Sequence, residues 1–305
     1  MSTARRPLPF VALLAVAVAG PLLVIPFAGA SVTKPARAVP FTVRLEDQIL
    51  AKLHYLPLTF VSTKATSATT TTTSTTTTTT QPPTTPITVV DSTPTTTTTL
   101  APPTTTTTLA NPTLIQKGSF VWRYPVMPTA VQRLWSVGTN NVVLTGALMR
   151  FQNVHGLPTT GQMNTTTWHS LVTAARKNQI DPNPYTYVYV SQTQPESLKL
   201  YINNYLFFST AVNTGISVAP TANGTFPVYV RYTTTTMSGK EPDGKPYHDA
   251  GIPWVSYFNG GDALHGFIRG GYGYPQSLGC VEMTYAHAAI VWPHTPVGTL
   301  VTVAP

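Results

Sequence analysis

Cys280 is the only cysteine in the chain, and His265 precedes it by fifteen residues. A thiol of ordinary pKa is mostly protonated at neutral pH, and a neighbouring imidazole can convert it into the thiolate of a thiolate–imidazolium pair, the active nucleophile. The two residues could therefore serve as nucleophile and base. The competing interpretation is a buried cysteine that packs as a small hydrophobic residue. The residues around Cys280 distinguish the two interpretations.

The residues beside Cys280 favour a catalytic role over a packing role. A glycine, Gly279, stands directly before the cysteine, and Ser277 lies two residues earlier. Glycine lets the backbone approach closely, so the amides around Gly279 and Cys280 can point at a developing oxyanion. This arrangement is typical of acyl transfer through a covalent intermediate.

The constellation resembles the L,D-transpeptidase catalytic domain of the YkuD type. Its signature is a histidine-glycine pair, followed about fifteen residues later by S-x-G-C-[IV]-R. His265-Gly266, Ser277 and Gly279-Cys280-Val281 match this signature position by position. Pro220 to Val228 looks like the T-P-x-G-x-F-x-V hairpin of that family, and Pro253 to Gly261 looks like the strand before its histidine. The resemblance covers residues 185–303.

The resemblance implies acyl transfer on peptidoglycan stem peptides. Cys280 would attack the carbonyl of the third residue, a diamino acid, in a tetrapeptide stem and release D-alanine. The side-chain amine of a second stem would then resolve the thioester and form a cross-link. His265 would move the protons. The resemblance further implies that Ser277, Leu278 and Gly279 form the oxyanion loop, and that Gly266 and Glu282 stand at substrate-binding positions.

Two positions depart from the family pattern. Leu278 stands where histidine is usual, and Glu282 stands where arginine usually helps to order the loop and the substrate's carboxylates. Two alternatives therefore stay open beside the transpeptidase. One is an L,D-carboxypeptidase, in which water replaces the acceptor amine after the same acyl-enzyme. The other is a non-catalytic cell-wall-binding protein whose β module is a degenerate scaffold.

The elements that must position these residues follow from the pattern after Tyr185. Alternating, β-branched and aromatic runs predict a mainly β module over residues 185–304 with one helix at 284–291. Asn203-Asn204 predicts a hairpin turn. Strands are expected at residues 185–190, 197–202, 205–208, 226–232, 254–258, 263–268 and 299–303. The glycine-containing segment 233–251 is expected to be a lid over the donor stem.

Residues 114–180 are predicted to be a small helical domain. Apolar residues at helical spacing indicate helices at 129–137 and 145–155, and Asn164 can cap a third. The run from Ala147 to Pro158, followed by Gly161 and Thr167-Trp168, resembles the three-helix peptidoglycan-binding domain. That resemblance implies glycan strands as a partner. The expected fold class is therefore α+β multidomain, with this domain preceding the L,D-transpeptidase catalytic domain.

The N-terminal third predicts export. Residues 1–30 have a basic start, an apolar run at 10–27 and a small-residue cleavage site, which indicates a signal peptide or, if uncleaved, a membrane anchor. Residues 31–61 are a short segment expected to dock on a later domain. The Thr/Pro-rich tract at 62–113 is expected to be a disordered linker, typical of a stalk that lets a membrane-proximal N-terminus reach outward.

These features place the protein outside the cytoplasm, secreted to the cell wall or anchored at the membrane. The formal net charge of +8 comes partly from the leader, and the remaining excess is too small to indicate nucleic acid binding. No metal and no cofactor is expected. His248-Asp249 is poorly placed for joint chelation, and His287 and His294 are interpreted as structural.

Overall fold

The computed structural model of the chain describes residues 39–63, 117–124 and 127–305. The predicted signal or anchor (1–30) and nearly all of the predicted linker (62–113) lie outside these ranges. Within the described ranges no helix has the length and apolar character needed to cross a bilayer.

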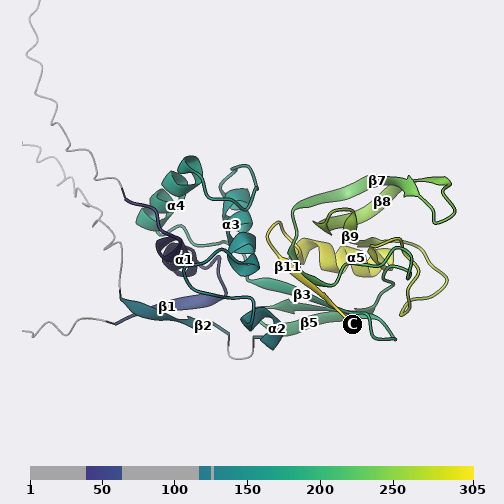
Figure 1. Ribbon diagram of the computed structural model, residues 1–305, viewed down its shortest axis with the longest axis horizontal. Coiled ribbons are helices and arrows are strands. Elements are labelled where there is room, and N and C mark those ends of the chain that lie inside the picture. The colour runs from purple at the N-terminus through teal and green to yellow at the C-terminus, as the bar shows by residue number, and fades with distance from the viewer. Residues whose placement is uncertain (1–38, 64–116, 125–126) are drawn as a thin grey trace, which may run out of the picture. The chain divides into compact units, whose positions relative to one another are not determined.

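The helical part combines residues from both sides of the Thr/Pro-rich tract (Figure 1). Three helices pack around Phe151 and Trp168, which lie in one apolar cluster with Leu50 and Leu53. Each of the three begins at a side-chain cap: Thr42, Asn141 and Asn164 accept a hydrogen bond from a backbone N–H of the first turn. The elements are α1 (Val43–Lys52), β1 (Leu58–Ser62), β2 (Gly118–Trp122), α2 (Thr129–Gln132), α3 (Val142–Val154) and α4 (Thr165–Lys177).

The helix expected at 129–137 is wrong in length. It forms a single turn, α2, and only Val131 of its apolar residues is fully buried, so nothing in the core extends it. Helix α1 fills that place in the packing instead, with Leu50 and Leu53 fully buried. The docking expected of residues 31–61 is thus confirmed for the described part of that segment.

The Thr/Pro-rich tract starts and ends at neighbouring residues. Strands β1 and β2 pair antiparallel from Leu58↔Trp122 to Ser62↔Gly118. Beyond them the Thr63 N–H donates to the Lys117 carbonyl at 2.8 Å. The predicted stalk is therefore wrong in its connectivity, because residues 39–63 are already held against the helices that follow the tract.

The C-terminal part contains two sheets with helix α5 (Tyr285–Val291) packed beside β8 and β9 (Figure 1). One sheet has the order β5-β4-β3-β11-β6 and the other β10-β9-β8-β7. A core that includes Val188, Leu264 and Val301 joins them. The strands are β3 (Thr186–Ser191), β4 (Ser197–Ile202), β5 (Tyr205–Ala211), β6 (Gly224–Pro227), β7 (Val230–Lys240), β8 (Pro246–Asn259), β9 (Asp262–Gly266), β10 (Val281–Met283) and β11 (Leu300–Ala304), and a 3-10 turn, η1 (Trp292–His294), follows α5.

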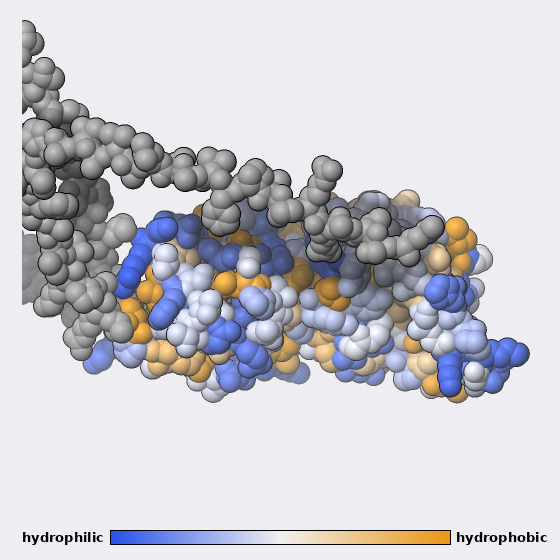
Figure 2. Space-filling view, turned by 90° about the horizontal axis from the view of Figure 1, so that it is seen from above, coloured by the Kyte–Doolittle hydropathy of each residue, from blue (hydrophilic) through white to orange (hydrophobic). Residues whose placement is uncertain are grey.

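Most predicted strands are present, with two differences. The run 226–232 forms two strands, because the chain leaves β6 after Pro227 and enters β7 at Val230, in the other sheet. The segment 233–251, expected to be a lid, belongs to a hairpin of β7 and β8 whose pairing shifts register between Thr235 and Met237 and continues out to Lys240↔Pro246. In the space-filling view the visible described surface mixes hydrophilic and hydrophobic residues without separating them into faces (Figure 2).

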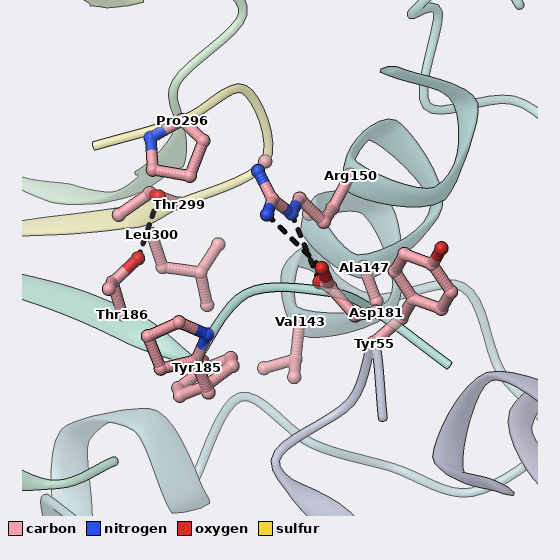
Figure 3. Close-up of a pocket in the computed structure, with 13 residues that line it drawn as sticks. Tyr55, Val143, Ala147, Arg150, Asp181, Tyr185, Thr186, Pro296, Thr299 and Leu300 are labelled. Carbon is pink, nitrogen blue, oxygen red and sulfur yellow. Dashed lines mark hydrogen bonds and ion pairs between the residues drawn. The ribbon is translucent and has the colours of Figure 1, made fainter. Parts of the chain in front are cut away.

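The helices and the five-stranded sheet meet around a small pocket, where Val143 and Arg150 of α3 lie near Thr186 and Leu300 (Figure 3). Arg150 of α3 makes a bidentate ion pair with Asp181, at 3.0 and 3.1 Å, and both side chains are nearly buried. A Cβ on Gly146 would lie 2.7 Å from the Gly298 carbonyl oxygen, so α3 approaches the turn before β11 as closely as glycine permits. This contact fixes the five-stranded sheet, which shares a core with the four-stranded sheet that carries the site.

Candidate active site

Strands β9 and β10 bring the predicted catalytic residues together. They pair in parallel, with Leu264 opposite Val281 and His265 opposite Glu282. Side chains alternate between the faces of a strand, so Leu264 and Val281 enter the core while His265 and Glu282 face a cleft. Cys280, one residue before Val281, reaches the same cleft. The register thus places nucleophile and base on one wall.

The cleft has a volume of about 730 Å³. The hairpin β7–β8 also lines the cleft, with Met237, Tyr247 and Ile252. The position expected for a lid is therefore a wall beside Cys280. Leu278 and Glu282, the two departures from the family pattern, also line the cleft.

Cys280 carries a neutral thiol in this environment. It packs against an apolar cluster that includes Ala263, Ile252 and Val255, and this burial raises the pKa of Cys280 to about 12. The nearby carboxylates of Glu282 and Asp262 raise it further, while the Ala263 backbone N–H acts in the opposite direction. The thiol lies 3.7 Å from the carbonyl oxygen of Gly261, an acceptor that only a protonated sulfur can serve.

His265 is a neutral imidazole with a defined tautomer. Only 2% of the residue is exposed, and its burial lowers its pKa. Its Nδ1 lies 3.0 Å from the carbonyl oxygen of Gly266. A carbonyl accepts only, so Nδ1 carries the proton and Nε2 is the basic nitrogen. Burial therefore favours the neutral form of both partners over the expected resting thiolate–imidazolium pair, which stays a prediction.

The loop before the cysteine is held by Ser277. Its hydroxyl donates to the Cys280 carbonyl at 2.6 Å and accepts the Gly279 N–H at 3.2 Å. Gly279 has a φ of +118°, which side chains rarely tolerate. The Gly279 amide is thus engaged within the loop. The amides of Leu278 and Cys280, on either side of Gly279, do not donate to the Ser277 hydroxyl.

The buried carboxylate of Glu196 helps to hold this loop against residues 213–214. Glu196 is 1% exposed and accepts hydrogen bonds at 2.7 Å from both the backbone N–H and the hydroxyl of Thr214. The carbonyl of Thr214 then accepts the Ser277 N–H at 3.0 Å. Asn213 pairs with Glu282 on the other side of the cysteine. Both ends of the nucleophile loop are therefore fixed by one segment.

Glu282 is paired with a guanidinium that the sequence pattern did not predict. Arg269 donates from Nε and Nη2 to the two oxygens of Glu282, at 2.7 and 2.8 Å. Arg269 also lines the cleft and lies over the ring of Phe267. The cleft therefore contains a guanidinium, held by Glu282, although no arginine stands two residues after the cysteine.

The residues expected to bind substrate are not all in the cleft. Gly266 packs against α5, where a Cβ would lie 2.8 Å from the ring of Tyr285. Its missing side chain therefore serves helix packing, Gly266 is not among the residues that line the cleft, and its assignment to substrate binding stays a prediction. Arg269 and Asp262 line the cleft, and sequence reasoning missed both. In the sequence, only their position within four residues of His265 indicated that Arg269 and Asp262 could belong to the site.

The comparisons agree with the predicted catalytic module. Residues 185–303 match the sequence model of the YkuD family, described as the L,D-transpeptidase catalytic domain. This is less than half of the chain, and it confirms the predicted family for that module. The matched residues do not include the helical part. No curated protein matches the chain at a significant level.

Solved structures similar to the chain include three L,D-transpeptidases. One from Mycobacterium smegmatis is 16% identical over 40% of this chain and 59% of that chain, with a TM-score of 0.36. A mutant enzyme from Enterococcus faecium is 18% identical over 47% and 64%, with a TM-score of 0.37. The catalytic domain of an E. faecium enzyme is 22% identical over 40% and 99%, with a TM-score of 0.36. The chain thus spans about three fifths of the first of these relatives.

The neutral thiol predicts a steep pH profile for alkylation. With the pKa of Cys280 raised to about 12, the thiolate fraction should grow about tenfold per pH unit from about pH 6 to pH 9. Iodoacetamide alkylation, followed by intact mass, should rise with that slope, whereas free cysteine should level off near pH 9. A plateau for Cys280 near neutral pH would instead establish a thiolate–imidazolium pair.

The Arg269–Glu282 pair predicts a stability effect. Arg269→Ala leaves Glu282, only 4% exposed, without its partner, and this should lower the free energy of unfolding by about 3 kcal/mol. The double variant Arg269→Ala/Glu282→Gln should recover part of the loss in urea denaturation. The control is Lys245→Ala, which breaks the exposed pair with Asp243 and should not move the midpoint. A double variant no more stable than the single one would contradict the pairing.

Proposed function

We propose that the protein is a cysteine-dependent L,D-transpeptidase that cross-links peptidoglycan stem peptides. The observation that carries the proposal is the placement of Cys280 and His265 on one wall of a cleft large enough for a peptide. The family match over residues 185–303 supports the same reaction class.

In the acylation step, the Cys280 sulfur attacks the carbonyl carbon of the diamino acid in the donor stem while His265 Nε2 takes the thiol proton. Proton transfer accompanies attack because both groups start neutral. The amides of Leu278 and Cys280 stabilise the oxyanion. The carbon–nitrogen bond then breaks, and the imidazolium returns the proton to the leaving D-alanine amine, which leaves a thioester.

Arg269 is proposed to bind the free carboxylate of the donor stem. It is the guanidinium among the described residues that line the cleft, and Glu282 fixes its plane through two hydrogen bonds. A planar guanidinium suits a carboxylate better than a lysine ammonium does. The departure at Glu282 is thereby compensated within the same cleft, which favours an active enzyme over a degenerate scaffold.

The helical part is proposed to bind the glycan strands of peptidoglycan. The motif around Phe151 and Trp168 supports this, although both side chains serve the core, at 0% and 6% exposure. Any contact with glycan must therefore use neighbouring exposed residues. We further propose that the protein acts outside the cytoplasm, secreted or held by residues 10–27, since its substrate lies there.

Acylation by a carbapenem tests the reaction class, because a strained lactam can trap a nucleophile as a stable acyl-enzyme. The full chain should gain the mass of one carbapenem. Cys280→Ala should gain none, and His265→Ala should react at least about a hundredfold more slowly, the usual loss on removing a general base. Equal labelling of Cys280→Ala and the unaltered chain would refute the nucleophile assignment.

Sedimentation with insoluble wall material tests the helical part. The fragment to use begins at Val39, because α1 completes the helical core, and ends at Asn183. After circular dichroism confirms its helices, it should pellet with purified peptidoglycan. If the folded fragment stays in the supernatant while the full chain pellets, wall binding belongs to the catalytic part.

A further inference from the structure

Asp262 is a carboxylate that the acylation step does not use. It is the first residue of β9 and lines the cleft beside Cys280. Its Oδ2 accepts hydrogen bonds from the Ala222 N–H and from the Asn259 side chain, both at 3.2 Å. Its Oδ1 lies against Gly279, where a Cβ would be only 2.6 Å away. The glycine before the nucleophile thus gives this carboxylate room.

The position of Asp262 works against the first half of the reaction. Its negative charge contributes to raising the pKa of Cys280. The same charge opposes the oxyanion that forms beside Leu278 and Cys280 during attack. A carboxylate at this place is therefore useful only in a step that brings a positive charge to the sulfur.

The other charged residues that line the cleft are mostly acidic. The charged residues among the described lining are Glu241, Asp249, Asp262 and Glu282 against Arg269, and the last two neutralise each other. The chain as a whole carries a net charge of +8, so this acidic lining is local. Complementary charge favours a cationic ligand over a neutral one.

We propose that Asp262 binds the acceptor's side-chain ammonium beside the Cys280 thioester and takes its proton, which makes the cleft selective for amine transfer over hydrolysis. This inference rests on the proposed function and names its acceptor class, a primary amine that is cationic in solution. Burial raises the pKa of Asp262, which eases proton transfer from the ammonium.

The step balances as follows. The ammonium gives one proton to Asp262, and the neutral amine nitrogen attacks the thioester carbonyl. The carbon–sulfur bond breaks, and the second nitrogen proton passes through His265 to the Cys280 sulfur. The products are an amide, a neutral thiol and a protonated Asp262, which then loses its proton to solvent.

The experiment compares acceptors in the full chain with Asp262→Asn. Asparagine keeps an oxygen for the donors Ala222 and Asn259 but removes the charge. With a donor tetrapeptide containing a diamino acid, the ratio of transfer to N-acetyl-lysine amide over hydrolysis should fall about tenfold. Trapping by hydroxylamine, which is uncharged at neutral pH, should not fall. Alkylation of Cys280 by iodoacetamide should be as fast as in the unaltered chain or faster.

The matched control is Asp249→Asn, which removes the same charge from the same cleft at a position on β8. Its transfer ratio should fall much less than that of Asp262→Asn, because it removes a lining charge but keeps the carboxylate beside the sulfur. The inference is overturned if both variants lose transfer equally, if hydroxylamine trapping falls with amine transfer, or if Asp262→Asn changes nothing.

A measurement without any variant guards against misfolding of Asp262→Asn. In the unaltered chain, Nε-trimethyl-lysine, a cation that cannot react, should inhibit transfer to the amine, and norleucine should not. Equal inhibition by both overturns the inference. An unaltered chain that hydrolyses the donor but never transfers also overturns it, while leaving Cys280 as nucleophile. A chain that forms no acyl-enzyme refutes the proposed function itself.

Discussion

The site depends on the parallel pairing of β9 with β10. Its register sets His265 opposite Glu282 and leaves Cys280 directly before β10. Parallel neighbours cannot be joined by a tight turn, so the chain must make a long connection between them. That connection, residues 267–280, is where Arg269 and the Ser277 loop are found. One pairing therefore supplies the nucleophile, the base, the guanidinium and the oxyanion loop.

The same pairing places a negative charge beside the nucleophile. Alternation along β10 turns both Cys280 and Glu282 toward the cleft, so an anion lies beside a nucleophile that must shed a proton. Arg269 neutralises Glu282, which otherwise would be a buried unpaired charge. Asp262 has no such cationic partner on the described residues and keeps the cleft acidic. The charges are thus arranged for the incoming amine more than for the resting thiol.

The sequence predicts local features well and long-range partners poorly. The Asn203-Asn204 turn, the helix capped by Thr284 and the strand that carries His265 follow from patterns a few residues long. Arg269 could not be found in this way, because its pairing with Glu282 depends on how β9 and β10 align. The pKa of Cys280 was likewise beyond reach, since its shift comes from burial under strands distant in sequence.

The connectivity of the N-terminal part limits the distance that could separate a membrane anchor from the catalytic cleft. The antiparallel pairing of β1 with β2 closes the Thr/Pro-rich tract at its base, so its length adds nothing to the distance between Val39 and the catalytic cleft. Were residues 10–27 to remain as an anchor, only residues 28–38 would separate it from Val39. At about 3.5 Å per residue, such a tether spans at most about 40 Å. If the proposed anchor is retained, this length limits how far Val39 can lie from the membrane.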